Sequence, residues 1–222
     1  MARTRLFLAR ACALVAAAAF LWCARGGAAE NDAPARAREI LSATGITGGL
    51  IVHIGARDAA VTAALLSIEG AQVLEGDPAN VGVLFRAGFR MISPTHFFDN
   101  DMGGSAHGVN KYGLTDKGKK MVRLMEQKGM IVDLAHASPR TIDDVLAVAT
   151  RPMVVSHTGV QGTCPGVRNI SDRHMRMIAG KGGVIGIGYF PRATCGESVG
   201  AIVRSIRHAA ERAGVRHVGL GS

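Results

Sequence analysis

Apolar residues along most of the chain follow two alternating patterns, short β-branched runs and longer stretches with helical spacing. The clearest example spans residues 130–157, which read MIVDLAHASPRTIDDVLAVATRPMVVSH. Two apolar runs, 130–135 and 153–156, each precede a histidine, and the segment between them is long enough for one helix. Ser138 is a good N-cap residue, and Pro139 suits the first helical position. The pattern predicts one strand–helix–strand unit.

The same alternation continues on both sides of this unit. Further strands are predicted at 49–54, 63–68, 89–95, 183–189 and 217–220, and further helices at 77–87, 114–128, 172–179 and 199–213. Strands that alternate with helices predict a parallel α/β sheet, either an open doubly wound sheet or a (β/α) barrel. We favour a TIM-type (β/α) barrel that is incomplete at both ends. Polar residues end four different strands, and a barrel rim gathers such residues around one axis.

The residues that end these four strands are Glu69, His96, His136 and His157. Crossover helices make consecutive strands parallel, so these side chains are expected to meet at the carboxyl edge of the sheet. A carboxylate and two imidazoles are a common ligand set for zinc, which makes Glu69, His136 and His157 the candidate metal ligands. A metal held in this way activates water and polarises a carbonyl, which is the equipment for amide hydrolysis.

Two side chains are candidates for substrate binding. His96 lies on the same expected edge and is placed to donate to an oxyanion. Arg168, in a long predicted loop at 158–171, is suited to hold a substrate carboxylate with its planar guanidinium. Simpler structural interpretations exist, in which the histidines and Glu69 cap strands or turns and Arg168 is a solvated charge. The repeated placement of polar residues at strand ends favours the functional interpretation.

Length and composition fit one catalytic domain. The chain has 222 residues, of which 48% are hydrophobic, and its 29 glycines suit an α/β domain with many short loops. Residues 1–29 read as a signal peptide, with a basic start, an apolar run that is short for a membrane span, and small residues near a cleavage site at Ala29. An uncleaved anchor and a lipoprotein attached at Cys23 are the alternatives.

The charge distribution bears on possible partners. The formal net charge falls from +9 to +5 when the four arginines of the predicted signal are removed. The remaining basic residues are scattered and are not interleaved with aromatic residues, which argues against a nucleic-acid partner. Cys12 and Cys23 lie in or beside the signal, which leaves Cys164 and Cys195. In an oxidising compartment this pair forms either a disulfide or two free thiols, and the residues alone do not decide between them.

Six short motifs resemble those of the membrane (renal-type) dipeptidases. In chain order they are SIEG at 67–70, THFFDN at 95–100, GLT at 113–115, VDLAHAS at 132–138, SH at 156–157 and RN at 168–169. Members of this family are zinc dipeptidases with a TIM-barrel fold. The resemblance covers about residues 60–222, the partial barrel domain. Residues 30–59 are then a linker and a diverged N-terminal segment.

The resemblance implies roles for individual residues. Glu69 matches the carboxylate that bridges two zinc ions, and His136 and His157 match ligands of the second zinc. His96 matches the histidine that binds substrate and stabilises the tetrahedral intermediate. Arg168 matches the residue that binds the terminal carboxylate of the dipeptide. The two remaining cysteines, Cys164 and Cys195, match positions that are disulfide-bonded in animal members.

Two motifs of the membrane dipeptidases have no counterpart in this sequence. The opening His-x-Asp pair is missing, since His53 is followed by Ile54 and Gly55, and the chain ends at Ser222 before the family's acidic proton-transfer residue. We therefore expect a truncated or impaired zinc dipeptidase that keeps one of two zinc ions. The alternative is a non-catalytic dipeptidase-like binding module with one metal site. A methyltransferase-like stretch at 40–58 is a third, short resemblance.

These interpretations predict where the protein acts and what it meets. We expect export to the periplasm or the extracellular space, where a dipeptide is the substrate. Membrane association through an uncleaved signal and formation of a homodimer are left open.

Overall fold

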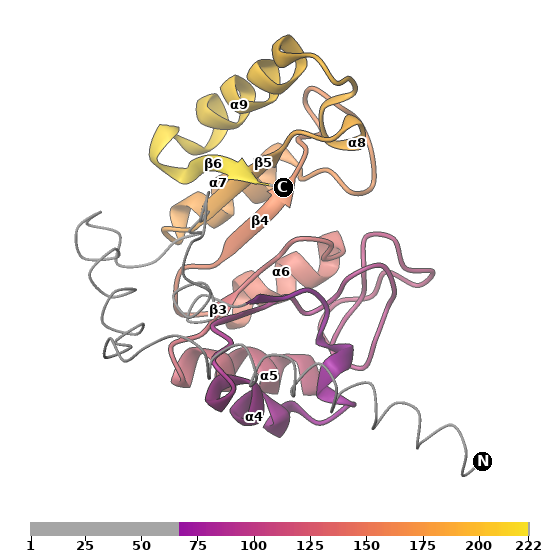
Figure 1. Cartoon of the computed structure of the whole chain (residues 1–222), viewed down its shortest axis with the longest axis vertical. Coiled ribbons are helices and arrows are strands. Elements are labelled where there is room, and N and C mark those ends of the chain that lie inside the picture. The colour runs from indigo at the N-terminus through magenta and orange to yellow at the C-terminus, as the bar shows by residue number, and fades with distance from the viewer. Residues whose placement is uncertain (1–66, 222) are drawn as a thin grey trace, which may run out of the picture. The chain divides into compact units, whose positions relative to one another are not determined.

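The computed structural model describes residues 67–221 of the chain (Figure 1). Several predicted features lie outside the described residues. These are the signal peptide at 1–29, the segment at 30–59, the methyltransferase-like stretch at 40–58, the strand at 49–54 and most of the strand at 63–68.

The first part of the described chain contributes three short parallel strands in the order β1-β2-β3. They are β1 (Ser67–Ile68), β2 (Met91–Ile92) and β3 (Ile131–Val132). The helical elements between them are η1 (Ala71–Leu74), η2 (Pro78–Asn80), α4 (Val81–Arg86) and α5 (Asp116–Gln127). The predicted helix at 77–87 is therefore a 3-10 turn followed by one short α-helix.

The second part adds three longer parallel strands in the order β4-β5-β6. They are β4 (Val154–Thr158), β5 (Val184–Gly188) and β6 (Val218–Gly221). The helical elements are α6 (Pro139–Val148), α7 (Asp172–Gly180), α8 (Pro191–Thr194), α9 (Val199–Ala213) and η3 (Val215–His217). The short elements η1, α8 and η3 were not expected from the hydrophobic pattern.

A single parallel bridge between Asp133 and Val154 connects β3 to β4, and the Leu134 N–H donates to the Val154 carbonyl at 2.8 Å. The bridge stays short because the Asp133 side chain, rather than a backbone carbonyl, accepts the Ser156 N–H at 2.8 Å. The six strands thus follow one another in chain order without the reversal of a doubly wound sheet. This confirms a parallel α/β fold, although residues 67–221 do not form a closed barrel.

Local signals set the helix starts as predicted. Thr115 caps α5 by accepting from the Gly118 N–H, and Ser138 caps α6 by accepting from the Thr141 N–H. Pro139 occupies the first helical position of α6. The apolar faces of the helices pack on the strands around a core that includes Leu74, Ile92, Met121, Met125, Val145, Met153, Ile178, Ile185 and Ile187. Within residues 67–221, every helix is too short or too polar to cross a membrane.

Candidate metal centre

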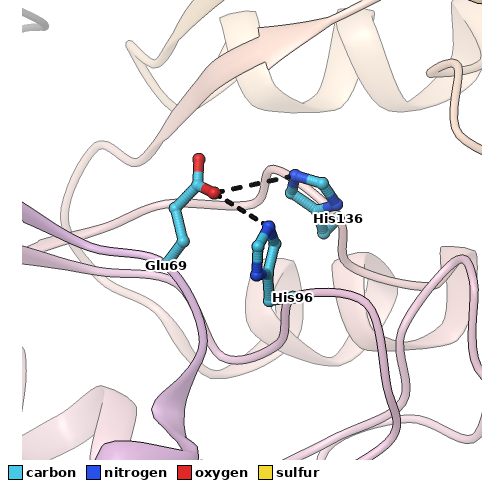
Figure 2. A group of neighbouring side chains, drawn as sticks. All are labelled: Glu69, His96 and His136. Carbon is cyan, nitrogen blue, oxygen red and sulfur yellow. Dashed lines mark ion pairs between the residues drawn. The ribbon is translucent and has the colours of Figure 1, made fainter.

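All four residues expected at strand ends lie at the carboxyl edge of the sheet. Glu69 directly follows β1, His96 and His136 lie in the loops after β2 and β3, and His157 is near the end of β4. Figure 2 shows Glu69, His96 and His136 pointing toward one another from three different segments. The expectation that parallel strands bring these side chains together is confirmed.

The Glu69 carboxylate faces all three imidazoles. Its Oε2 lies 3.0 Å from His96 Nε2 and 4.0 Å from His136 Nε2, and its Oε1 lies 3.4 Å from His157 Nδ1. The Nε2 atoms of His136 and His157 are 2.9 Å apart. Among residues 67–221, Glu69, His96 and His136 are the group whose metal-ligand atoms all lie within 4.8 Å of one another. The compact donor group therefore includes His96, which the sequence pattern assigned to substrate binding.

Hydrogen bonds between loops hold the histidine backbones. The Ser105 hydroxyl donates to the His96 carbonyl at 2.5 Å, and the Ala106 N–H donates to the His136 carbonyl at 2.8 Å. His136 has a φ of 63°, a left-handed conformation that is unusual for a residue with a side chain. Such backbone strain persists only where the surroundings enforce it, and it gathers at functional sites.

A buried hydrogen-bond network connects Asp133 through Ser156 to His157. Asp133 is 2% exposed, and its Oδ1 accepts the N–H groups of Ser156 at 2.8 Å and Ala135 at 3.0 Å. Its Oδ2 lies 2.6 Å from Ser156 Oγ, which in turn lies 2.9 Å from His157 Nδ1. Adjacent strand residues normally face opposite sides. Here the register of β4 shifts between Val155 and Thr158, which lets Ser156 and His157 serve the same site.

Burial keeps the two inner histidines neutral. It lowers the pKa of His136 to about 2, and the Arg168 guanidinium and neighbouring imidazoles act in the same direction. Burial also lowers the pKa of His157, again with help from Arg168, while Glu69 opposes the shift. Neutral imidazoles offer the lone pairs that a metal ion requires. The buried Nδ1 of His136 has no hydrogen-bond partner among the described residues.

Arg168 lies in the loop between β4 and α7, beside the histidines. Its Nη2 donates to the His157 carbonyl at 2.7 Å. Burial lowers the pKa of Arg168 to about 10, while Asp133 and Glu69 oppose this shift, so the guanidinium stays charged at neutral pH. It therefore brings a fixed positive charge to the edge of the site, while the binding of a substrate carboxylate by Arg168 stays a prediction.

A disulfide joins the Arg168 loop to the segment after β5. Cys164 and Cys195 are bonded, with their Cα atoms 5.3 Å apart, which settles a question that the residues alone left open. Asn169 adds a second connection, because its Nδ2 donates to the carbonyls of Cys164 at 2.7 Å and Arg192 at 3.1 Å. The two loops on this side of the site are thus held together covalently and by hydrogen bonds.

The four strand-end residues and Arg168 line one cavity of about 440 Å³. Besides the four strand-end residues and Arg168, its lining includes side chains that the sequence reasoning did not single out: Phe97, His107, Phe190 and Arg192. Phe97 belongs to the THFFDN motif, so its place beside His96 in that motif could have marked it as a site residue. His107 and Phe190 lie outside helices and strands and Arg192 lies in the short helix α8, and no local pattern marks any of them. The volume suits a small ligand.

The donor chemistry fits a divalent transition metal. Such ions bind neutral imidazole nitrogens together with carboxylate oxygens, and tetrahedral zinc holds nitrogen ligands at about 2.0–2.1 Å. Two such nitrogens on one ion lie roughly 3.3 Å apart by that geometry. The 2.9 Å between the Nε2 atoms of His136 and His157 approaches this value. The Glu69 carboxylate offers an anionic oxygen near this pair, because its Oε2 lies 4.0 Å from His136 Nε2.

Comparison with known sequences identifies relatives. The model of the membrane dipeptidases, peptidase family M19, matches residues 54–222. Dipeptidase verJ of Clonostachys rogersoniana is 32% identical over 164 residues, which cover 72% of this chain and 42% of that protein. The chain spans about two fifths of the length of the curated relatives it matches.

Solved structures agree with this relationship. A metallo peptidase from Rhodobacter sphaeroides, liganded with a phosphinate mimic of the dipeptide L-Ala-D-Ala, is 25% identical with a TM-score of 0.65. That match covers 71% of this chain and 49% of the other. Dipeptidase AC, of family M19, shares the fold with a TM-score of 0.68 at 24% identity, over 84% of this chain and 55% of its own. The chain belongs to the membrane dipeptidase family, peptidase family M19.

Proposed function

We propose that this chain carries the metal and substrate site of a zinc-dependent dipeptidase. The observation that carries the proposal is the convergence of Glu69 with three imidazoles in one cavity beside Arg168. Family membership and a relative that carries a dipeptide mimic support the same substrate class. We also propose that the six strands in chain order are part of a (β/α) barrel, as in the family that the motifs resemble.

Glu69, His136 and His157 are the proposed zinc ligands. His136 and His157 are buried and neutral, and their Nε2 atoms face each other. His96 is more open, with 28% of its side chain exposed, and it stands at the cavity wall as an N–H donor to Glu69. Zinc bound there supplies a Lewis acid that lowers the pKa of water and polarises the peptide carbonyl.

The remaining residues bind and orient the dipeptide. Within residues 67–221 the Arg168 side chain makes one hydrogen bond, to the His157 carbonyl, and its other N–H groups are suited to hold the substrate's terminal carboxylate. His96 is placed to donate a hydrogen bond to the oxygen that gains charge as the carbonyl is attacked. Phe97 and Phe190 line the same cavity and exclude water from it.

Export is proposed along with this activity. The disulfide between Cys164 and Cys195 supports it, because such bonds persist in oxidising compartments. The basic and apolar residues of segment 1–29 provide the signal for translocation. Expression of the full chain in cells, followed by detection in the secreted or periplasmic fraction, checks this expectation.

Metal content and dipeptide hydrolysis test the proposed function. The variants Glu69→Gln, His136→Ala and His157→Ala are expected to lose most of the bound zinc and the activity. The variant His96→Ala is expected to keep zinc while kcat falls by roughly 100-fold or more, as for loss of an oxyanion donor. His208→Ala is the matched control, since His208 bonds Asp172 away from the cavity.

Three outcomes would change the assignment. Unchanged zinc content in all three ligand variants would refute the metal site. Loss of zinc in His96→Ala would make His96 a ligand, in keeping with its place in the compact donor group. Zinc and saturable dipeptide binding without product would instead identify a binding module.

A further inference from the structure

Asp133, Ser156 and His157 form a buried hydrogen-bond network. The number of available protons determines which group donates and which accepts in each bond. The Ser156 hydroxyl carries one hydrogen and lies between Asp133 Oδ2 at 2.6 Å and His157 Nδ1 at 2.9 Å. It can donate to only one of them. An ionised carboxylate only accepts, and 2.6 Å is the length of a charge-assisted O–H···O⁻ bond.

Burial raises the pKa of Asp133, while three hydrogen-bond donors and the charge of Arg168 oppose that shift. The arrangement of these donors matches an ionised carboxylate. Two backbone N–H groups, from Ser156 and Ala135, point at its Oδ1, and the serine hydroxyl points at its Oδ2. With the hydroxyl hydrogen directed to Asp133, Ser156 Oγ accepts from His157 Nδ1 at 2.9 Å, and Glu69 Oε1, 3.4 Å from Nδ1, is a second and longer acceptor for the same proton. The imidazole proton then sits on Nδ1, and the Nε2 lone pair faces His136 Nε2 at 2.9 Å.

We propose that Asp133 and Ser156 are positioning residues that fix His157 as the Nδ1–H tautomer, with its Nε2 lone pair directed to the metal position. The inference rests on the proposed function in one respect, namely that His157 is a metal ligand. Ligand histidines generally keep their tautomer through a bond from the second ring nitrogen. Here a serine carries that bond to a carboxylate on the neighbouring strand.

The geometry favours this role over simple strand pairing. Strand pairing alone needs only Asp133 Oδ1, which replaces a backbone acceptor for the Ser156 N–H. The bond between Oδ2 and the hydroxyl adds nothing to the pairing of β3 with β4. The shifted register of β4 is what turns the Ser156 side chain toward His157, and it breaks the regular ladder to do so.

Nitrogen NMR of the metal-free wild-type protein gives the first test, because the two ring nitrogens report which of them carries the proton. The expected spectrum shows His157 as the Nδ1–H tautomer. A spectrum with the proton on Nε2 would overturn the proposal, whatever the protein does with zinc. This readout needs no metal, so it separates failure of the inference from failure of the proposed function.

The variant Asp133→Asn gives the second test. Its amide oxygen can keep both backbone N–H donors, but its NH₂ group donates to Ser156 Oγ and turns the hydroxyl toward His157 Nδ1. The proton of His157 then moves to Nε2. We expect the tautomer signal to reverse and zinc affinity, measured by chelator competition, to fall by roughly 10–100-fold. Wild-type tautomer and affinity in this variant would refute the proposal.

Serine variants cover the case in which Asp133→Asn does not fold. Ser156→Ala removes the acceptor and is expected to lower zinc affinity by roughly 10-fold or more, whereas Ser156→Thr keeps the hydroxyl and the affinity. Equal affinities in these two variants would contradict a positioning role. Ser205→Ala is the control, because Ser205 is also a buried serine but its hydroxyl lies 2.9 Å from the Thr163 hydroxyl. Its zinc affinity should equal that of the wild type.

Discussion

Breaking the disulfide between Cys164 and Cys195 should destabilise the protein and loosen one wall of the candidate site. The two cysteines are 31 positions apart. Closing a loop of that length in the unfolded chain is worth about 4 kcal/mol of unfolding free energy in the chain-entropy model. For a domain of this size, that loss corresponds to a melting temperature lower by roughly 8–16 °C.

The variant Cys164→Ala/Cys195→Ser tests this value with little other change. Cys164 is 2% exposed, so alanine avoids placing a hydroxyl in the interior, while Cys195 is exposed and tolerates serine. Urea unfolding followed by circular dichroism gives the free energy. Reduction of the wild-type protein should produce a loss of the same size, because it removes the same constraint without changing a side chain.

The same variant should affect substrate binding more than metal binding. Arg168 lies in the loop after β4 and Arg192 in α8, the two segments that the disulfide joins, whereas the proposed zinc ligands lie in β4 or in the segments that follow β1 and β3. We expect a raised KM for dipeptides and unchanged zinc affinity. A loss of unfolding free energy below about 1 kcal/mol in both experiments would refute the loop-entropy reasoning.

Three further predictions concern single residues. Arg192→Gln should raise KM for dipeptides with an acidic side chain more than for neutral ones, because Arg192 and Arg168 line the same cavity; equal changes in steady-state assays would argue against this. Gly186→Ala should weaken zinc binding and lower the melting temperature, since a Cβ there would meet the Ser156 carbonyl beside the site. Asp172→Asn should cost about 1 kcal/mol at pH 7, because hydrogen bonding from His208 and the charge of Arg212 hold the pKa of Asp172 below its usual value. Because the folded pKa is depressed, this added stability is complete above the unfolded value near 4 and is lost as pH falls through the lower, folded value. The difference from wild type should therefore vanish in strong acid, and a difference that persists in acid melts would contradict the assignment.

Much of the local structure was predictable because its causes are local. Thr115 and Ser138 cap helices through a backbone N–H three residues away, and these bonds form wherever the surrounding chain is helical. The apolar periodicity fixed which faces of α5, α6, α7 and α9 are buried. The predicted helix at 77–87 was less accurate, because Asp77 and Pro78 favour a 3-10 turn before α4 begins.

The meeting of Glu69 with the three histidines was also predictable, since it follows from topology. Parallel strands linked by helices must end at one edge, so residues at equivalent strand ends approach one another whatever their neighbours are. The family motifs then suggested which chemistry to expect there. The sequence did not predict the distances between these four side chains, nor which of them bind metal and which donate hydrogen bonds. Side-chain rotamers and loop positions set both.

The sequence by itself determined the longer helices, the parallel order and the residues that gather at the carboxyl edge, because helix caps and hydrophobic periods act over a few positions. Only the tertiary structure decided the disulfide pairing, the second arginine in the cavity and the buried path from Asp133 through Ser156 to His157. Asp133 and Ser156 are 23 positions apart, and His136 and His157 are 21 apart. Contacts over such separations depend on how the strands pack and on where the register of β4 shifts. A short stretch of sequence determines neither of these.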